Sequence, residues 1–239
     1  MSGGAYSALS GMRTRLEELD RLAADLANVS TAGYKTERAG TLSAERDFAS
    51  ALEGAVDVVP GQAKIDFRPG TIANTGRDLD VAIEGRGFFV VETPQGERYT
   101  RNGSFTRRAD GVLATSQGEP VLGENGEIRL PRGPITIDPD GTIKAGATVA
   151  GKLQIVEFDQ DTDVVRESGA RFRAIAGATP RPSTTATLLG GTLEQSNASV
   201  VDLMAKLTEV SRGFESLQKG VSTIQNDLDS RAISELARR

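Results

Sequence analysis

Apolar side chains recur with a helical spacing at both ends of the chain, and this pattern limits the fold more than any other feature. From about residue 4 to 28, and again from about 197 to 236, they follow one another at alternating steps of four and three residues. Such steps place side chains along one narrow stripe of an α-helix. The N-terminal stripe is Ala5, Leu9, Met12, Leu16, Leu19, Ala23 and Leu26, and the C-terminal stripe is Leu203, Leu207, Val210, Phe214, Leu217, Val221, Ile224 and Leu228.

Local signals mark where the two predicted helices end and begin. Ser30, Thr31 and Gly33 follow the first stripe and are typical of a helix C-terminus. Ser196 and Asn197 precede the second stripe and can supply an N-cap. At about 1.5 Å per residue the predicted helices are roughly 36 Å and roughly 55 Å long.

The two stripes need a partner, because an isolated amphipathic helix is only marginally stable in water. They can pair with each other, pair with stripes of other copies, or stay partly unfolded until they do. A helical hairpin packed on the chain's own central domain is a further alternative. The narrow width of the stripes favours coiled-coil-like pairing in an assembly, because a helix packed on its own domain usually has a broader apolar face.

The middle of the chain has a different pattern, with many glycines and turn dipeptides between short apolar runs. Asn-Gly or Asp-Gly occurs at residues 102–103, 110–111, 125–126 and 140–141, and these dipeptides favour β-hairpin turns. The predicted fold class is therefore α+β, with long terminal helices that pair in an assembly core and a central all-β domain of many short strands. The predicted divisions are 1–54 (helix and extended connector), 55–192 (β-rich domain) and 193–239 (helix).

Composition excludes several classes of function. The chain has no cysteine and no histidine, so a Ser-His-Asp or Cys-His catalytic group and zinc sites built on these residues are absent. Its net charge is −5 with the signs interspersed, which argues against nucleic acid as a partner. We expect no enzyme activity, cofactor or metal, although a carboxylate-based hydrolase stays formally open.

Two short motifs resemble ligand sites but lack essential residues. Asp159, Asp161 and Asp163 alternate as in a calcium loop, but Val164 and Ala170 stand where the loop needs glycine and glutamate. Gly85-Arg86-Gly87 begins like a dinucleotide motif without its third glycine. No apolar stretch is long enough to insert into a membrane, and the N-terminus lacks the features of a cleavable signal peptide.

Several segments, in the expected order along the chain, resemble the flagellar rod and hook protein family. The N-terminal signature is LANVSTAGYK at residues 26–35, and GTLEQSN at residues 191–197 resembles the segment that opens the C-terminal helix of the family. Further likeness covers residues 78–89, 99–105, 110–115, 118–123 and 212–215. Asp25 and Gly213 depart from the usual Asn and Ala. The motif positions are Ala27, Asn28, Thr31, Gly33, Tyr34, Leu193, Glu194, Ser196 and Asn197.

The resemblance implies a structural role in the bacterial flagellum. Members are exported through the flagellar type III apparatus with an uncleaved N-terminal signal. They assemble helically with further copies and with neighbouring rod proteins into a torque-transmitting shaft across the periplasm, in the basal body. Terminal helices form the inner tubes of this shaft, and the β-domain lies outside.

Within the family, the length and the short stretch between residues 151 and 191 resemble the proximal type of rod protein more than the distal type. The distal type is the first alternative. A binding module that presents its β-domain on a discrete coiled-coil oligomer is the second.

Overall fold

The computed structural model describes residues 2–40 and 61–236, with side chains from 11–38 and 64–223. The chain forms two compact units. Of the described residues, a helical unit draws on 2–27, 37–40, 61–64 and 199–236, and a β-rich unit comprises 28–36 and 65–198. Residues 28–36 and 193–198 thus belong to the β-rich unit, whereas the sequence analysis assigned them to the terminal segments. Part of the predicted connector, residues 41–60, lies outside the described residues.

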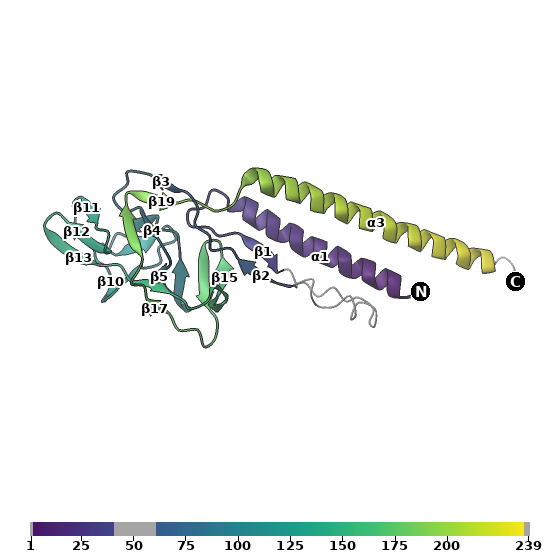
Figure 1. Ribbon diagram of the computed structural model, residues 1–239, viewed down its shortest axis with the longest axis horizontal. Coiled ribbons are helices and arrows are strands. Elements are labelled where there is room, and N and C mark those ends of the chain that lie inside the picture. The colour runs from purple at the N-terminus through teal and green to yellow at the C-terminus, as the bar shows by residue number, and fades with distance from the viewer. Residues whose placement is uncertain (1, 41–60, 237–239) are drawn as a thin grey trace. The chain divides into compact units, whose positions relative to one another are not determined.

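The helical unit contains two long helices that run side by side in opposite directions (Figure 1). α1 spans Ser2–Ala27 and α3 spans Val200–Leu236, and strands β1 (Glu37–Gly40) and β2 (Gly61–Ile65) form a two-stranded sheet in the same part of the chain. A Cβ built at Gly11 would lie 3.8 Å from Leu217 Cδ1, and one at Gly213 would lie 3.9 Å from Arg15 Nε. The helices of one chain therefore contact each other directly.

The N-cap of α3 differs from the sequence prediction. The helix begins at Val200, and Ser199 Oγ accepts a hydrogen bond from the Asp202 backbone N–H at 3.4 Å. Asn197, a predicted cap, instead donates its side-chain amide to the Asp66 carbonyl at 2.7 Å. Its side chain is engaged within the β-rich unit, so Ser199 caps the helix.

Antiparallel pairing organises the β-rich unit into short sheets. The largest has six strands in the order β15-β16-β6-β5-β14-β17, a three-stranded sheet has the order β11-β12-β13, and β3–β19, β4–β18, β7–β8 and β9–β10 form pairs. A short 3-10 helix covers Asp161–Asp163. The strands are β3 Ile72–Asn74, β4 Val81–Glu84, β5 Phe88–Thr93, β6 Gly96–Thr100, β7 Phe105–Arg107, β8 Leu113–Thr115, β9 Leu122–Gly123, β10 Gly126–Glu127, β11 Ile135–Ile137, β12 Thr142–Ala145, β13 Thr148–Lys152, β14 Ile155–Glu157, β15 Val164–Ser168, β16 Arg171–Ala174, β17 Arg181–Pro182, β18 Thr187–Gly190 and β19 Thr192–Glu194.

Three of the four predicted hairpin turns are confirmed. Gly111, Gly126 and Gly141 have φ of 86°, 96° and 88°. Gly111 and Gly141 lie in the turns of the hairpins β7–β8 and β11–β12, and Gly126 is the first residue of β10, directly after the turn from β9. The prediction at Asn102-Gly103 is wrong, because the flanking strands β6 and β7 pair with other strands. Gly103 serves close packing instead: a Cβ there would lie 1.7 Å from the Val81 carbonyl oxygen.

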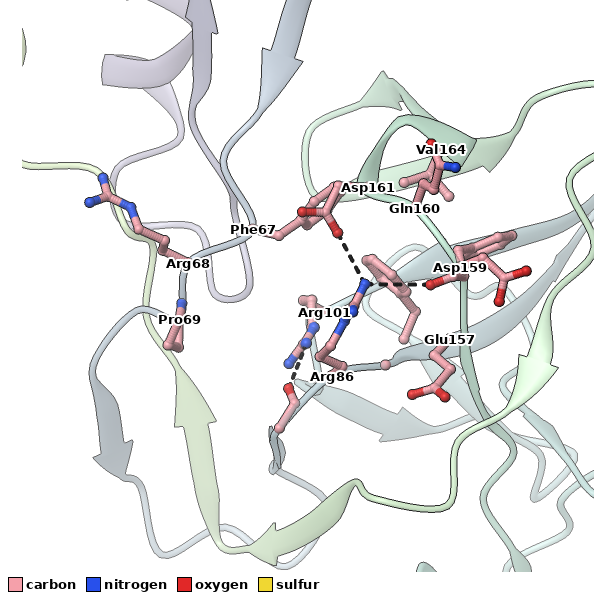
Figure 2. Close-up of a pocket in the computed structure, with 14 residues that line it drawn as sticks. Phe67, Arg68, Pro69, Arg86, Arg101, Glu157, Asp159, Gln160, Asp161 and Val164 are labelled. Atoms are coloured by element: carbon pink, nitrogen blue, oxygen red, sulfur yellow. Dashed lines mark hydrogen bonds and ion pairs between the residues drawn. The ribbon is translucent and has the colours of Figure 1, made fainter.

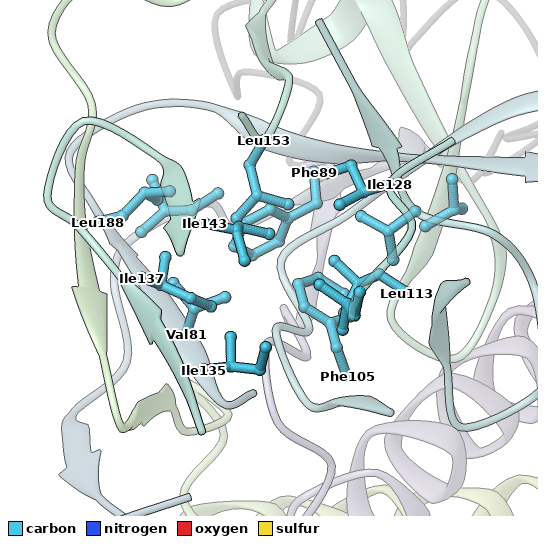
Figure 3. Close-up of a cluster of buried hydrophobic side chains, with 14 residues drawn as sticks. Val81, Phe89, Phe105, Leu113, Ile128, Ile135, Ile137, Ile143, Leu153 and Leu188 are labelled. Atoms are coloured by element: carbon cyan, nitrogen blue, oxygen red, sulfur yellow. The ribbon is translucent and has the colours of Figure 1, made fainter. Parts of the chain in front are cut away.

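The core of the β-rich unit lies on both faces of β5. Phe89 and Val91 point into one apolar cluster, drawn in Figure 3, while Phe88 and Val90 point into a second, aromatic one. Successive side chains of a strand point to opposite faces, so a continuous apolar run requires cover on both sides. In the first cluster the rings of Phe89 and Phe105 meet edge to face with centroids 5.0 Å apart.

Candidate functional site

The two segments with family motifs meet inside the β-rich unit. The Gly33 backbone N–H donates to the Glu194 carbonyl at 2.7 Å, and the Asn197 N–H donates to the Tyr34 carbonyl at 3.4 Å. The Thr36 N–H donates to Asn197 Oδ1 at 2.8 Å. The structure therefore joins the segment that follows α1 to the segment that precedes α3.

A buried ion pair lies at the centre of this junction. Lys35 Nζ donates to Glu194 Oε1 at 2.5 Å and to the Arg68 carbonyl at 3.0 Å. The side chains are 0% and 2% exposed, so neither charge is hydrated from bulk solvent. The Gly70 N–H also donates to Glu194 Oε1, at 3.1 Å. Two buried charges thus depend on each other for solvation.

Arg101 completes the group that we call the buried ion cluster, consisting of Lys35, Arg101 and Glu194. Arg101 Nη1 lies 3.5 Å from Glu194 Oε2, and the guanidinium also donates to the carbonyls of Ile83 and Gly85 at 3.2 Å and 2.8 Å. Burial lowers the pKa of Lys35 below that of a free lysine, and the Glu194 carboxylate opposes this shift. Burial also lowers the pKa of Arg101, again against the effect of Glu194.

Backbone contacts around the buried ion cluster leave no room for side chains at two glycines. A Cβ at Gly33 would lie 2.3 Å from the Arg101 carbonyl carbon, and Gly33 has a φ of 67°. A Cβ at Gly70 would lie 1.9 Å from the Gln195 carbonyl oxygen. Both contacts require glycine, because real Cβ atoms do not approach backbone so closely.

The remaining motif residues surround this junction. Tyr34 is buried, with the Arg166 guanidinium carbon 4.4 Å from its ring centroid, and Thr31 Oγ1 donates to Asn28 Oδ1 at 3.2 Å. Ser196 Oγ accepts the Ala198 N–H at 3.1 Å. Leu193 and Ser196 are half-buried, and Ala27 is the exposed last residue of α1.

Sequence reasoning missed Lys35 and Arg101 as site residues, although both lie in segments that resemble the family. The available signal was that each charged residue lies within two residues of an aromatic residue and a glycine of a family segment, in AGYK at residues 32–35 and YTRNG at residues 99–103. Pattern analysis cannot pair Lys35 with Glu194, because 159 residues separate them.

The two apolar stripes are covered unequally. In the C-terminal stripe Leu203 and Val210 are buried, and Leu207, Phe214, Leu217 and Val221 are half-buried. In the N-terminal stripe Leu16 is 46% exposed, Ala23 is exposed, and Met12, Leu19 and Leu26 are half-buried. The side chains of Ala5, Leu9, Ile224 and Leu228 lie outside the described residues.

A different face of α1 is buried. Leu22 is 7% exposed and Asp25 is 2% exposed, and neither belongs to the predicted stripe. Gly11 and Arg15, which approach α3, also lie off the stripe. Positions 11, 15, 18 and 22 share one side of a helix at about 3.6 residues per turn. Within the described residues, part of the N-terminal stripe therefore stays uncovered.

A pocket of about 590 Å³ in the β-rich unit is lined by both acidic and basic side chains (Figure 2). Arg86 lies in it and donates to Asp161 Oδ1 at 3.3 Å and to the Phe158 carbonyl at 3.5 Å. Asp159 pairs with Arg181 at 3.0 Å, and Glu157 Oε2 accepts the Ser183 hydroxyl at 3.2 Å. These carboxylates have partners already, so the arrangement does not present the pair of converging acids that a hydrolase needs.

None of the helices in the described ranges combines the length and the apolar character that a membrane span requires.

Two long terminal helices and a β-rich unit in which the motif segments meet define an α+β protein with the elements that the rod and hook family resemblance implies. Residues 82–145 match the family model described as flagellar hook protein FlgE/F/G D1 domain, and residues 189–235 match flagellar basal body rod FlgEFG protein C-terminal.

Full-length relatives identify the family. The chain is 36% identical to the flagellar basal-body rod protein FlgF of Caulobacter vibrioides, over 92% of each chain. It is 33% identical to FlgF of Escherichia coli, over 95% of this chain and 96% of the relative. It is 31% identical to FlgG of Bacillus subtilis, over 91% and 93%. The chain belongs to the flagellar basal-body rod protein family, and of the two types it resembles FlgF more.

Proposed function

We propose that this chain is a structural subunit of the proximal part of the flagellar basal-body rod, and that it polymerises through its terminal helices to transmit torque. The observation that carries this proposal is the uncovered N-terminal stripe. Leu16 stays 46% exposed although α3 lies alongside α1. An apolar stripe that one chain leaves uncovered can be buried by a helix from another copy in coiled-coil-like packing.

The likeness to FlgF relatives supports the rest of the proposal. Neighbouring rod proteins are the expected partners, the flagellar type III apparatus is the expected export route, and the basal body is the expected location. The proposed assembly interface comprises the residues of both stripes, of which Leu203 and Val210 are already buried in the single chain and would support the interface from beneath. The chain acts without catalysis or cofactor. Its relatives carry the name of a structural part of the basal body.

Replacing Leu16 with glutamate is expected to abolish motility while the isolated protein still folds. Leu16 is 46% exposed in the single chain, so the free energy of unfolding should fall by only about 1 kcal/mol. In an assembly the same charge would be buried without a partner. Complementation of a deletion strain on soft agar measures the first effect, and thermal unfolding measures the second.

Val165→Glu is the matched control. Val165 is 37% exposed on strand β15 of the β-rich unit, so the same kind of substitution leaves both stripes intact, and motility should persist. Normal swimming of the Leu16→Glu strain would contradict the proposed interface. A deletion strain that swims normally would contradict the proposed function as a whole.

The distal type is the second candidate, because the FlgG relative also matches over most of the chain. Cryo-microscopy of basal bodies that contain a labelled copy separates the two. A label near the membrane end of the rod supports the proximal type, and one near the hook end supports the distal type.

A further inference from the structure

A second pocket of the β-rich unit, with a volume of about 420 Å³, is bordered by arginine side chains. Arg77 and Arg107 line it, and Arg132 lies two residues after Leu130, which lines it as well. The Arg107 guanidinium donates to the Pro131 carbonyl at 3.0 Å, so it lies beside Arg132. We call Arg77, Arg107 and Arg132 the arginine pocket.

The positive charge of the arginine pocket is only partly neutralised within the chain. Arg77 lies 3.4 Å from Oδ1 of the buried Asp80. Asp78, the carboxylate that lines the pocket, already accepts the Ile135 N–H at 3.2 Å. Arg132 is exposed and, among the side chains that the structure describes, forms no ion pair or hydrogen bond. The pocket therefore has an excess of positive charge.

A carboxylate is the ligand that suits such a pocket. A guanidinium presents its N–H donors in one plane and can bind a carboxylate through two of them. Leu79, Leu130 and Ile135 line the same pocket, and apolar walls strengthen the attraction because they keep water away from the charges. The occupant that fits is therefore an acidic side chain on an exposed segment.

The chain itself contains such a segment. From the end of β14 to the start of β15, carboxylates alternate with other side chains over residues 157–163, and the side chains of Asp159 and Asp161 are 59% and 64% exposed. Their partners, Arg181 and Arg86, are exposed as well, and surface ion pairs of this kind are weak enough to be exchanged. We call residues 157–163 the acidic loop.

The arginine pocket and the acidic loop lie at opposite ends of strand β4. Leu79, which lines the arginine pocket, precedes β4, whereas Arg86, which contacts Asp161, follows it (Figure 2). At about 3.3 Å per residue, β4 separates the two surfaces by roughly 10 Å. Opposite charges at opposite ends of one unit favour head-to-tail contact between copies. Because such a contact joins two different surfaces, it can repeat from copy to copy without closing.

We propose that the arginine pocket of one copy receives the acidic loop of the next copy, as a second contact between subunits in addition to the helix stripes. Asp159 and Asp161 of one copy bind Arg107 and Arg132 of the other. Charges at an exposed contact mainly select the partner surface and its orientation, and they add little affinity. The place of this contact in the rod rests on the proposed function, whereas the contact between isolated copies does not.

Thiol crosslinking between copies tests the proposal, because the chain has no cysteine of its own. One protein carries Pro134→Cys beside the arginine pocket, and the other carries Thr162→Cys in the acidic loop, both at exposed positions. Each protein also carries Leu16→Glu, which is expected to remove the stripe contact. A short bismaleimide joins cysteines that come close in a mixture of the two, and mass spectrometry distinguishes mixed pairs from like pairs.

At low salt, mixed pairs should exceed like pairs by about fivefold or more, because only the arginine pocket and the acidic loop attract each other. The mixed yield should fall several-fold in about 0.5 M salt, since ions screen exposed charges. Arg107→Glu/Arg132→Glu in the pocket protein should lower the mixed yield to that of like pairs. Asp159→Arg/Asp161→Arg added in the loop protein should restore it, because the signs are then reversed on both sides.

Arg129→Glu in the pocket protein is the matched control. Arg129 is another exposed arginine that forms no ion pair among the described side chains. Its neighbours Ile128 and Leu130 point into the apolar core, so Arg129 points to the opposite face. The same change of charge at this position should leave the mixed yield unchanged.

Three results would overturn the proposal: like pairs as frequent as mixed ones, a mixed yield that salt does not change, and charge reversal on both sides that fails to restore the mixed yield. The first two need no substitution in the arginine pocket, so they test the contact even if a charge-reversed protein does not fold. All crosslinks are measured on purified protein. A deletion strain that swims normally would therefore remove the rod function and leave this contact standing.

Discussion

The single variant Lys35→Met is expected to lower the free energy of unfolding by about 3 kcal/mol, because it removes the nearer of the two buried cations that pair with the Glu194 carboxylate. Glu194 is 2% exposed, and Lys35 supplies the shortest contact to it. Arg101 lies further away, at 3.5 Å from the other carboxylate oxygen, and cannot replace that contact.

Denaturant unfolding followed by far-ultraviolet circular dichroism measures the effect. Lys144→Met is the matched control, since Lys144 also contacts a carboxylate, Asp138, at 2.5 Å, but on the surface. The control should change the midpoint little, because exposed ion pairs contribute weakly. Equal midpoints for the two variants would show that Lys35 is not the essential partner of Glu194.

Gly103→Ala is expected to destabilise the β-rich unit by about 3 kcal/mol or more, the upper range for overpacking a well-filled site. The new methyl group would lie 1.7 Å from the Val81 carbonyl oxygen and 3.2 Å from the Phe89 ring. Backbone rather than a flexible side chain must then move, and Val81 and Phe89 belong to the main apolar cluster.

Gly126→Ala is the comparison that separates the cost of overpacking from the cost of placing alanine at a positive φ. Gly126 has a φ of 96° and open space around its Cβ position, so alanine there should cost about 1–2 kcal/mol of backbone strain. Thermal unfolding of both variants gives the comparison. If Gly103→Ala costs no more than Gly126→Ala, Gly103 acts as an ordinary turn residue and its close approach to Val81 is unimportant.

Local patterns of the sequence were sufficient for much of the fold. Alternating steps of four and three residues predicted both helices, and Asp110-Gly111, Asn125-Gly126 and Asp140-Gly141 predicted three hairpins. These predictions succeed because helix periodicity and left-handed turn residues depend on neighbours in the chain. The Asn102-Gly103 prediction failed because the same dipeptide also suits a close backbone contact, which no local pattern distinguishes.

The sequence by itself determined the two terminal helices, the β-rich middle and, through family resemblance, the motif positions that meet at the junction. Only the tertiary structure decided which face of α1 is buried, because Leu22 and Asp25 lie off the most regular apolar stripe, while Leu16 on that stripe stays exposed. It also decided that Lys35 pairs with Glu194 across 159 residues. The buried helix face and the ion pair depend on packing and electrostatics between distant segments, and the spacing of residues along the chain does not predict them.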